Sequence, residues 1–395
     1  MKRLRPANVK LTKMKRAIIA AGLLLVSAIA YAQSANDALK TRFDALIEQG
    51  LKDDPMPGIA VGIVRHGKLV YARGFGAQKM GEPAQPMTER SLFHMASITK
   101  TFVATSVMQL WEQGKVDLDA PVTKYLPYFK IDDPRYAKIT VRQMLSHSSG
   151  MPDVKDYEWN KPQNDDGALE RYVRSLASMK LKLLFEPGTG FSYSNMAYEL
   201  LGDLIAKVSG KTFEDYVEAN ILKPLGMKDS TLLLSKADPR LLAQGYTRPP
   251  GGDSASFRQV AAYPFNRMHS PSSDLMSNIQ DMSRWAMANL NHGELDGERI
   301  LKASTYDLIW KPAVEACRDH EREPQKCGRY VGISWFLQGR TISHSGGDDG
   351  FATVLILVPD ADLALMWMCN TDRPSTVPGK ISDEFFNLVK ETAAK

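Results

Sequence analysis

The chain has 395 residues, three cysteines and a formal net charge of +5. Its basic character is confined to the N-terminus, where seven Lys and Arg residues and no acidic residue fall within the first 32 positions. Removing these seven positive charges changes the net charge from +5 to −2. No Lys/Arg-rich stripe remains, which argues against nucleic acid as a partner. The remaining length suits one large domain or two intimately packed ones.

The first 32 residues have the pattern of an export signal. The cations precede an uncharged apolar run from Ala17 to Ala30, which ends in Ala30-Tyr31-Ala32, a small-x-small cleavage site. The run is too short to predict a membrane-spanning helix. We therefore expect residues 1–32 to be a signal peptide, and the mature protein to be periplasmic or secreted with no stable membrane span. An uncleaved amphipathic anchor is the alternative.

Two of the cysteines lie close together in the chain. Cys317 and Cys327 are ten residues apart in a polar segment. In the oxidising compartment that export implies, this spacing is compatible with a disulfide, although the sequence does not fix its geometry. Cys369 lies in an apolar run and is expected to be an inert buried thiol.

The first predicted elements after the leader are a helix and a hairpin. The helix covers Ala35 to Gln49, and the alternating runs Ile59 to Arg65 and Lys68 to Phe75 flank a His66-Gly67 turn. Strand patterns are then absent for some two hundred residues. Helical spacing takes their place, with helix stops at Gly114 and Gly210, in the segments Phe102 to Trp111, Met196 to Val208 and Phe213 to Ile221.

Strand patterns return near the C-terminus and are followed by an amphipathic helix from Ile381 to Ala394. The predicted strands are Tyr330 to Leu337, Arg340 to Ser343, Phe351 to Val358 and Leu363 to Cys369. The fold class is therefore α/β (α+β), an antiparallel sheet built from strands of both chain ends, flanked by helices. We expect residues 33–95 plus 320–395 to form the sheet-and-helix lobe and 96–319 a mostly helical inserted region, together one domain.

Ser97-Ile98-Thr99-Lys100 is the only Ser-x-x-Lys in the chain. Serine and lysine three residues apart share one helix face, and the start of a helix stabilises negative charge. A neighbouring amine that loses its proton activates a weak hydroxyl nucleophile. The alternative is that Ser97 caps the helix and Lys100 is a solvated surface residue.

Tyr193-Ser194-Asn195 is the only Tyr-x-Asn and follows a turn-rich loop. Such a loop presents side chains to a cleft. Held near a cation such as Lys100, Tyr193 would have a lowered pKa and would shuttle protons, while Asn195 would bind a substrate amide. The alternative is a buried tyrosine followed by an asparagine helix cap.

His344-Ser345-Gly346-Gly347 closes a predicted strand. Its glycines allow a ligand to approach the backbone, and a strand edge binds an extended substrate. The N–H groups of Gly347 and Ser97 would together form an oxyanion hole. The alternative is a plain β-turn with a solvated histidine.

These three motifs, in this order, resemble the penicillin-recognising serine hydrolases, closest in pattern to class C β-lactamases, D-alanyl-D-alanine carboxypeptidases and related esterases. The segments Ile139 to Pro152 and Glu186 to Gly188 are also similar to this family, so the resemblance covers most of the mature chain. Within them, His147 is interpreted as a scaffold residue.

The resemblance implies a β-lactamase/transpeptidase-like fold and one catalytic domain. It implies that Ser97 attacks a carbonyl of a small-molecule or peptide substrate, that Lys100 and Tyr193 move protons, and that water releases the acyl group. Asn195, His344, Ser345 and Gly346 would bind substrate, without a cofactor. Slow release would instead make the protein a penicillin-binding sensor or scaffold that is acylated without turnover.

The third motif departs from typical β-lactamases, which carry a lysine where this chain has His344. A histidine titrates near neutrality, so its attraction to a substrate carboxylate would fade as pH rises. Peptidase and esterase roles stay open beside β-lactamase activity. The chain has no Gly-x-Ser-x-Gly and no His-Glu-x-x-His, which disfavours an α/β-hydrolase and a metal site.

Overall fold

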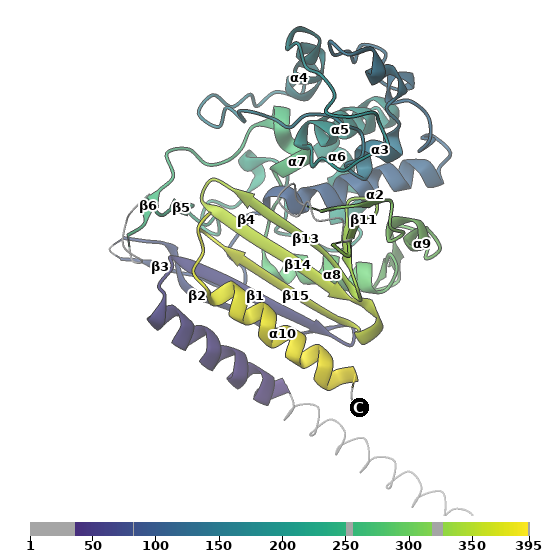
Figure 1. The fold of residues 1–395 in the computed structure, drawn as a ribbon. Helices are drawn as coiled ribbons and strands as arrows, with labels where there is room; N and C mark the ends of the chain where they lie inside the picture. Colours follow the sequence, from purple (N-terminus) through teal and green to yellow (C-terminus); the bar gives the residue numbers. More distant parts are fainter. Residues whose placement is uncertain (1–35, 82, 250–255, 318–326, 394–395) are drawn as a thin grey trace, which may run out of the picture.

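The computed structural model describes residues 36–81, 83–249, 256–317 and 327–393. Within them, a nine-stranded antiparallel sheet has the order β10-β11-β12-β13-β14-β15-β1-β2-β3 (Figure 1). Its strands are β1 (Gly58–Arg65), β2 (Lys68–Lys79), β3 (Gln85–Pro86), β10 (Val314–Glu315), β11 (Arg329–Val331), β12 (Phe336–Gln338), β13 (Thr341–Asp348), β14 (Phe351–Val358) and β15 (Leu363–Cys369).

Strands from the two ends of the chain meet in the middle of this sheet, as predicted. β1 pairs antiparallel with β15, so that Ile59 lies opposite Cys369. The β1–β2 hairpin turns at His66 and Gly67, whose φ angles of 51° and 65° are both left-handed. Two such residues give the turn twist that antiparallel strands favour, which confirms the predicted hairpin.

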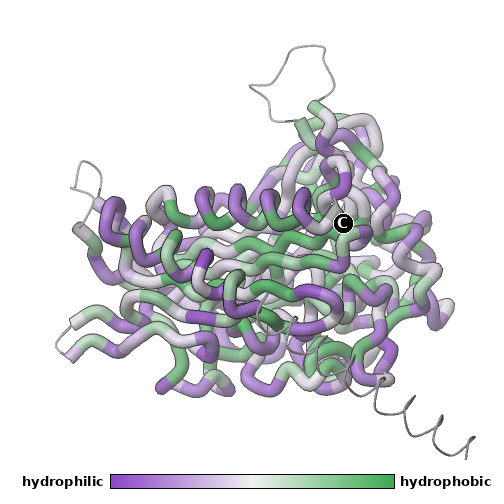
Figure 2. The backbone as a smooth tube through the Cα atoms, turned by 90° about the horizontal axis from the view of Figure 1, so that it is seen from below, coloured by the Kyte–Doolittle hydropathy of each residue, from purple (hydrophilic) through white to green (hydrophobic). Residues whose placement is uncertain are grey.

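The terminal helices cover one face of the sheet (Figure 1). The first described helix spans residues 36–53, and α10 (Val377–Ala393) begins four residues before its predicted start. Both contribute to one apolar cluster with the sheet, in which Phe43 and Phe385 are buried. Figure 2 shows the same arrangement in another view, with apolar strands beside helices of alternating polarity.

The opposite face carries the inserted helices, whose apolar side chains form the larger core cluster. They are α2 (Thr99–Glu112), α3 (Val141–Leu145), α4 (Ala168–Ser175), α5 (Asn195–Ser209), α6 (Phe213–Val217), α7 (Ser270–Ser273), α8 (Ile279–Leu290) and α9 (Thr305–Ile309). α8 packs directly on β1 and β15. A Cβ on Gly62 of β1 would lie 2.6 Å from Ile279, so only glycine permits this close approach.

The three predicted helices of the insert are present. Gly210, with φ 71°, ends α5 in the left-handed conformation that glycine adopts readily. The segment predicted from Phe213 to Ile221 is regular only to Val217 and continues as a π-turn over Glu218–Leu222. The described residues also form three short strand pairs that the sequence did not predict. Two lie within the insert, β5 (Tyr246–Thr247) with β6 (Arg258–Gln259) and β8 (Glu294–Leu295) with β9 (Glu298–Arg299), and the third joins β4 (Phe93–His94), just before the insert, to β7 (Met276–Ser277).

Two predictions about the C-terminal strands were wrong. The run from Tyr330 to Leu337 is two strands, β11 and β12, because Ser334 between them has a left-handed φ of 69°. The strand expected to end at Ser343 continues to Asp348, because it pairs with β14 along that whole length. The segment from His344 to Gly347 therefore lies inside a strand.

Cys317 and Cys327 form a disulfide, and Cys369 is buried. The predicted signal peptide lies outside the described residues. No helix in the described ranges is long and apolar enough to span a membrane. The proposed division between 33–95 plus 320–395 and 96–319 stays a prediction.

Candidate active site

Ser97 lies in a single 3₁₀ turn, η1 (Ala96–Ile98), that leads directly into α2. The preceding Ala96 has φ 48°, a left-handed conformation that costs a residue with a side chain roughly 1 kcal/mol. Neighbouring contacts hold this turn: Thr99 Oγ1 donates to Ala96 O at 2.7 Å, and Thr353 Oγ1 donates to Met95 O at 3.0 Å. The serine is therefore presented by a strained but anchored turn.

Lys100 lies one helical turn after Ser97 and is fully buried. Its Nζ is 2.9 Å from Ser97 Oγ and 2.8 Å from the backbone oxygen of Ser272 in α7. Burial disfavours the ammonium form and lowers the pKa of Lys100 to about 8, against the opposing effect of nearby carboxylates such as Glu199. A substantial fraction of this lysine is therefore a neutral amine near pH 8, able to accept the proton of Ser97.

Tyr193 completes this cluster, because its phenol lies close enough to Ser97 for the serine hydroxyl to lower the phenol pKa against the larger effect of burial. Lys100 Nζ is 5.1 Å from the centroid of the Tyr193 ring, which stacks on His147 at 4.2 Å. The expectation that Lys100 lowers the pKa of Tyr193 was wrong. Burial raises the pKa of this phenol well above its usual value. The hydroxyl is therefore protonated in the resting site.

His147 is buried behind Tyr193. Its Nδ1 accepts a hydrogen bond from the backbone N–H of Ser194 at 3.1 Å. Burial and the nearby Lys100 lower its pKa well below the usual range. A neutral, buried ring that stacks on Tyr193 agrees with the scaffold role expected of it.

Asn195 is the first residue of α5, and the helix cap is its neighbour Ser194, whose Oγ accepts from Ala197 N–H at 3.1 Å. The Asn195 side-chain amide nitrogen is 3.0 and 3.2 Å from the two carboxylate oxygens of Asp153. Asp153 therefore engages the donor end of this amide, and a substrate N–H would be met by its oxygen.

His344 on β13 is 2% exposed, and its Nδ1 is 2.7 Å from the backbone oxygen of Ser345. Burial, together with the charge of Lys100, lowers its pKa to about 3. The expectation that His344 titrates near neutrality was therefore wrong, because the ring is enclosed by protein. It contributes no positive charge to the site between pH 5 and 8.

The rest of the third motif lies against the turn that carries Ser97. Strand β13 packs on η1. A Cβ on Gly346 would lie only 2.3 Å from Met95 O and 2.5 Å from Thr353 Oγ1. Ser345 and Gly347 are exposed. The absence of a side chain at position 346 thus allows the strand and the nucleophile turn to touch.

Sequence reasoning missed the polar groups beneath this site. Glu199 in α5 is fully buried and accepts a hydrogen bond from Ser272 Oγ at 2.7 Å. Ser272 is also the residue whose backbone oxygen accepts from Lys100 Nζ, so Glu199 lies one residue behind Lys100. Asp348, at the end of β13, is 2.8 Å from His94 Nε2. The only hint in the sequence was closeness to the motifs: Asp348 directly follows the third motif, and His94 precedes Ser97 by three residues. Neither residue belongs to a known sequence motif.

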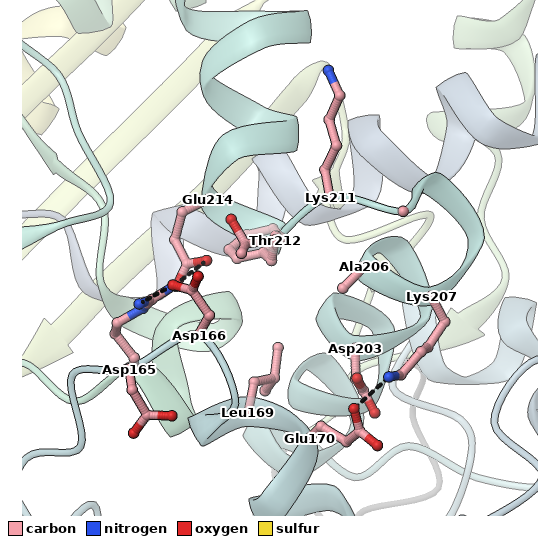
Figure 3. A pocket seen from close by; sticks show the side chains of 13 residues that line it. Asp165, Asp166, Leu169, Glu170, Asp203, Ala206, Lys207, Lys211, Thr212 and Glu214 are labelled. Atoms are coloured by element: carbon pink, nitrogen blue, oxygen red, sulfur yellow. Dashed lines mark hydrogen bonds and ion pairs between the residues drawn. The ribbon is translucent and has the colours of Figure 1, made fainter.

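A separate cavity of about 230 Å³ lies between α4, α5 and the start of α6 (Figure 3). Several of its charged side chains are paired with each other: Arg267 binds Glu214 and Asp166, and Lys207 binds Glu170. None of the three motifs lines it. The candidate site is therefore the cluster around Ser97 rather than this cavity.

Residues 43–382 match the family model described as Beta-lactamase. The chain belongs to the Beta-lactamase family. It has a mixed fold in which helices flank a large antiparallel sheet.

Several proteins are similar to this Beta-lactamase family member. Protein flp of Staphylococcus aureus (strain MW2) is 27% identical over 340 residues, which cover 85% of this chain and 64% of flp. The chain thus spans a little under two thirds of that relative's length. Esterase EstB of Burkholderia gladioli is 33% identical over 221 residues, which cover 53% of this chain and 55% of EstB.

Solved structures of similar fold include the octameric penicillin-binding protein homologue from Pyrococcus abyssi. It is 25% identical with a TM-score of 0.71, over 85% of this chain and 74% of that one. The structure titled SurE is 23% identical with a TM-score of 0.71, over 92% of this chain and 77% of that one, and its likeness concerns the fold alone.

Proposed function

We propose that this protein is an exported esterase or amidase that forms and hydrolyses an acyl-enzyme on Ser97. The observation that carries the proposal is the 2.9 Å contact between Lys100 Nζ and Ser97 Oγ at a fully buried lysine. A desolvated lysine is readily deprotonated, and its neutral amine can act as a base that activates the adjacent serine hydroxyl as a nucleophile.

In the proposed reaction, Ser97 Oγ attacks the substrate carbonyl and its proton passes to neutral Lys100 Nζ. The oxyanion that forms accepts hydrogen bonds from the backbone N–H groups of Ser97 and Gly347. The leaving alcohol or amine takes the Tyr193 hydroxyl proton, and the Lys100 ammonium restores it. Water then attacks the acyl-enzyme, giving one proton back to Ser97 and releasing the acid.

We favour ester substrates over β-lactams. The buried, neutral His344 supplies no cation for the carboxylate that a β-lactam carries, whereas an ester needs none. EstB is named as an esterase and is similar over about half of this chain. Small esters and D-amino-acid esters or peptides are therefore the first substrates to test.

Export is supported by two independent features. The leader pattern of residues 1–32 predicts secretion, and the Cys317–Cys327 disulfide suits an oxidising compartment. N-terminal sequencing of the protein recovered from a periplasmic or culture fraction should begin at Gln33. Recovery of the full leader on a cytoplasmic protein would contradict export.

The function is tested by turnover of purified protein on a p-nitrophenyl ester, a D-alanyl-D-alanine peptide and a chromogenic cephalosporin. We expect ester hydrolysis that the Ser97→Ala variant abolishes. Hydrolysis that survives this substitution would refute the site.

A chase with labelled penicillin addresses the sensor or scaffold alternative. If the label stays on Ser97 for hours and the protein hydrolyses none of the three substrates, the hydrolase proposal is refuted in favour of a protein that is acylated without turnover. Loss of label within seconds would exclude that alternative.

A further inference from the structure

Three segments that are distant in the chain meet beneath the candidate site. β4 ends at His94, three residues before Ser97. α7 contains Ser272, whose backbone oxygen accepts from Lys100, followed by Ser273. β13 ends at Asp348, directly after Gly347 of the proposed oxyanion hole.

One carboxylate joins these three segments. Asp348 Oδ2 is 2.8 Å from His94 Nε2 and also accepts a hydrogen bond from Ser273 Oγ. Because a carboxylate only accepts, the proton of this contact lies on His94 Nε2. His94 is completely buried, Ser273 is 3% exposed and the Asp348 side chain is 13% exposed. Water therefore competes little for these bonds.

The orientation of His94 is fixed by packing as well. Its ring lies 5.8 Å from the ring of Phe351 and 6.1 Å from that of Tyr263, measured between centroids. Asp348 and Phe351 are paired across the turn between β13 and β14. The His94–Asp348 contact thus ties the nucleophile turn to a strand end that is itself held in register.

This tie lies where the backbone requires support. Ala96, between His94 and Ser97, has the left-handed φ of 48°, and such a conformation persists only where its surroundings hold it. Oxyanion-hole donors stabilise a transition state only when their spacing is set before the reaction. The two proposed donors, Ser97 N–H and Gly347 N–H, lie on or beside two of the three segments that Asp348 joins, since Ser97 lies three residues after β4 and Gly347 lies on β13.

We propose that Asp348 is a positioning residue for acylation, which through His94 and Ser273 sets the spacing between Ser97 and the backbone of Gly347. The inference rests on the proposed function, because it concerns the same site. Asp348 takes no part in bond making. Its loss should lower the rate of the chemical step and leave substrate binding almost unchanged.

The test compares Asp348→Asn with Asp349→Asn. Both variants remove one negative charge at the same turn, but no described hydrogen bond joins Asp349 to the nucleophile turn or to α7. The measured quantities are the single-turnover acylation rate and KM for a p-nitrophenyl ester, with thermal unfolding to establish that each variant is folded at the assay temperature. We expect Asp348→Asn to slow acylation at least tenfold with KM within threefold, and Asp349→Asn to stay within twofold of the parent.

Two further variants keep the proposal testable if Asp348→Asn does not fold. Ser273→Ala removes a single hydroxyl and should slow acylation at least threefold with KM unchanged. His94→Asn combined with Asp348→Asn should slow it less than the product of the two single effects, because both changes break one contact.

Acylation within twofold of the parent in both Asp348→Asn and Ser273→Ala would overturn the positioning role. Equal losses of acylation rate in Asp348→Asn and Asp349→Asn would also overturn it, because the lost charge alone would then explain both. An effect on KM without any effect on the acylation rate would overturn it as well. A parent protein without any turnover that depends on Ser97 would instead refute the proposed function, and the positioning role with it.

Discussion

Lys100 Nζ and Ser97 Oγ lie 2.9 Å apart on one turn of the chain, and the lysine side chain has no exposed surface. Burial is what distinguishes this pair from a Ser-x-x-Lys on a protein surface. Desolvation is the largest influence on the pKa of Lys100 and lowers it. In the proposed mechanism, this burial is what lets Lys100 act as the base for the Ser97 hydroxyl.

The first prediction concerns pH. In the proposed mechanism the neutral amine is the active form, and burial brings the pKa of Lys100 down to about 8. For ester hydrolysis, kcat/KM should therefore rise about tenfold per pH unit below pH 8 and level off above it. A profile from pH 6 to 10, with the Ser97→Ala variant subtracted as background, measures this. A flat profile between pH 6 and 8 would show that Lys100 is not the base.

Glu199 provides a means of moving that profile. Its carboxylate is buried behind Ser272, and its negative charge opposes the lowering of the Lys100 pKa. In Glu199→Gln the rise of kcat/KM should therefore occur at lower pH than in the parent. Asp203→Asn is the matched control, because Asp203 is a buried acid on the same helix whose carboxylate binds Tyr128 at 2.7 Å. Equal shifts in both variants, or a shift to higher pH, would contradict this role.

Tyr193 is predicted to donate its proton to the leaving group. Because its pKa is raised by burial, the phenol is protonated throughout the working range. Tyr193→Phe should keep the stacking on His147 but slow acylation by about 10²–10⁴-fold, the usual contribution of a positioned proton donor.

Tyr198→Phe is the control for that change. Tyr198 is also buried, its ring is 5.6 Å from Lys100 Nζ, and its hydroxyl donates to Leu145 O at 2.8 Å. Losing this bond should cost about 1 kcal/mol of stability and leave the acylation rate within a few-fold of the parent. Similar kinetic losses in the two variants would remove Tyr193 from the mechanism.

The sheet was predictable because its strands obey local rules. The β1–β2 hairpin follows from alternation around His66-Gly67, and apolar runs at both chain ends predicted one shared sheet, although not that β1 would pair with β15. The end of β13 was not predictable in this way. Ser345, Gly346 and Gly347 have the composition of a turn, and only their pairing with β14 keeps them extended.

The site was predictable as a set of motifs and less so as chemistry. The order of the motifs predicted that Ser97, Lys100 and Tyr193 form one site. The protonation states of Tyr193 and His344, however, depend on burial by segments far away in the chain. The same holds for Asp348, whose partner His94 is separated from it by 254 residues. Tertiary contacts of this kind leave no periodic signal in a single sequence.

Gly346 gives the last prediction. A Cβ at this position would lie 2.3 Å from Met95 O, a backbone atom that cannot move without moving the nucleophile turn. Gly346→Ala should therefore reduce the free energy of unfolding by about 1–3 kcal/mol and lower kcat/KM for the ester, because β13 is pushed away from Ser97.

Gly379→Ala, in α10 with no atom within 4 Å of the added Cβ, should leave kcat/KM unchanged and raise stability by up to about 1 kcal/mol. Urea unfolding and ester kinetics on the two variants measure both effects, and a fully active Gly346→Ala would show that this strand need not touch the nucleophile turn.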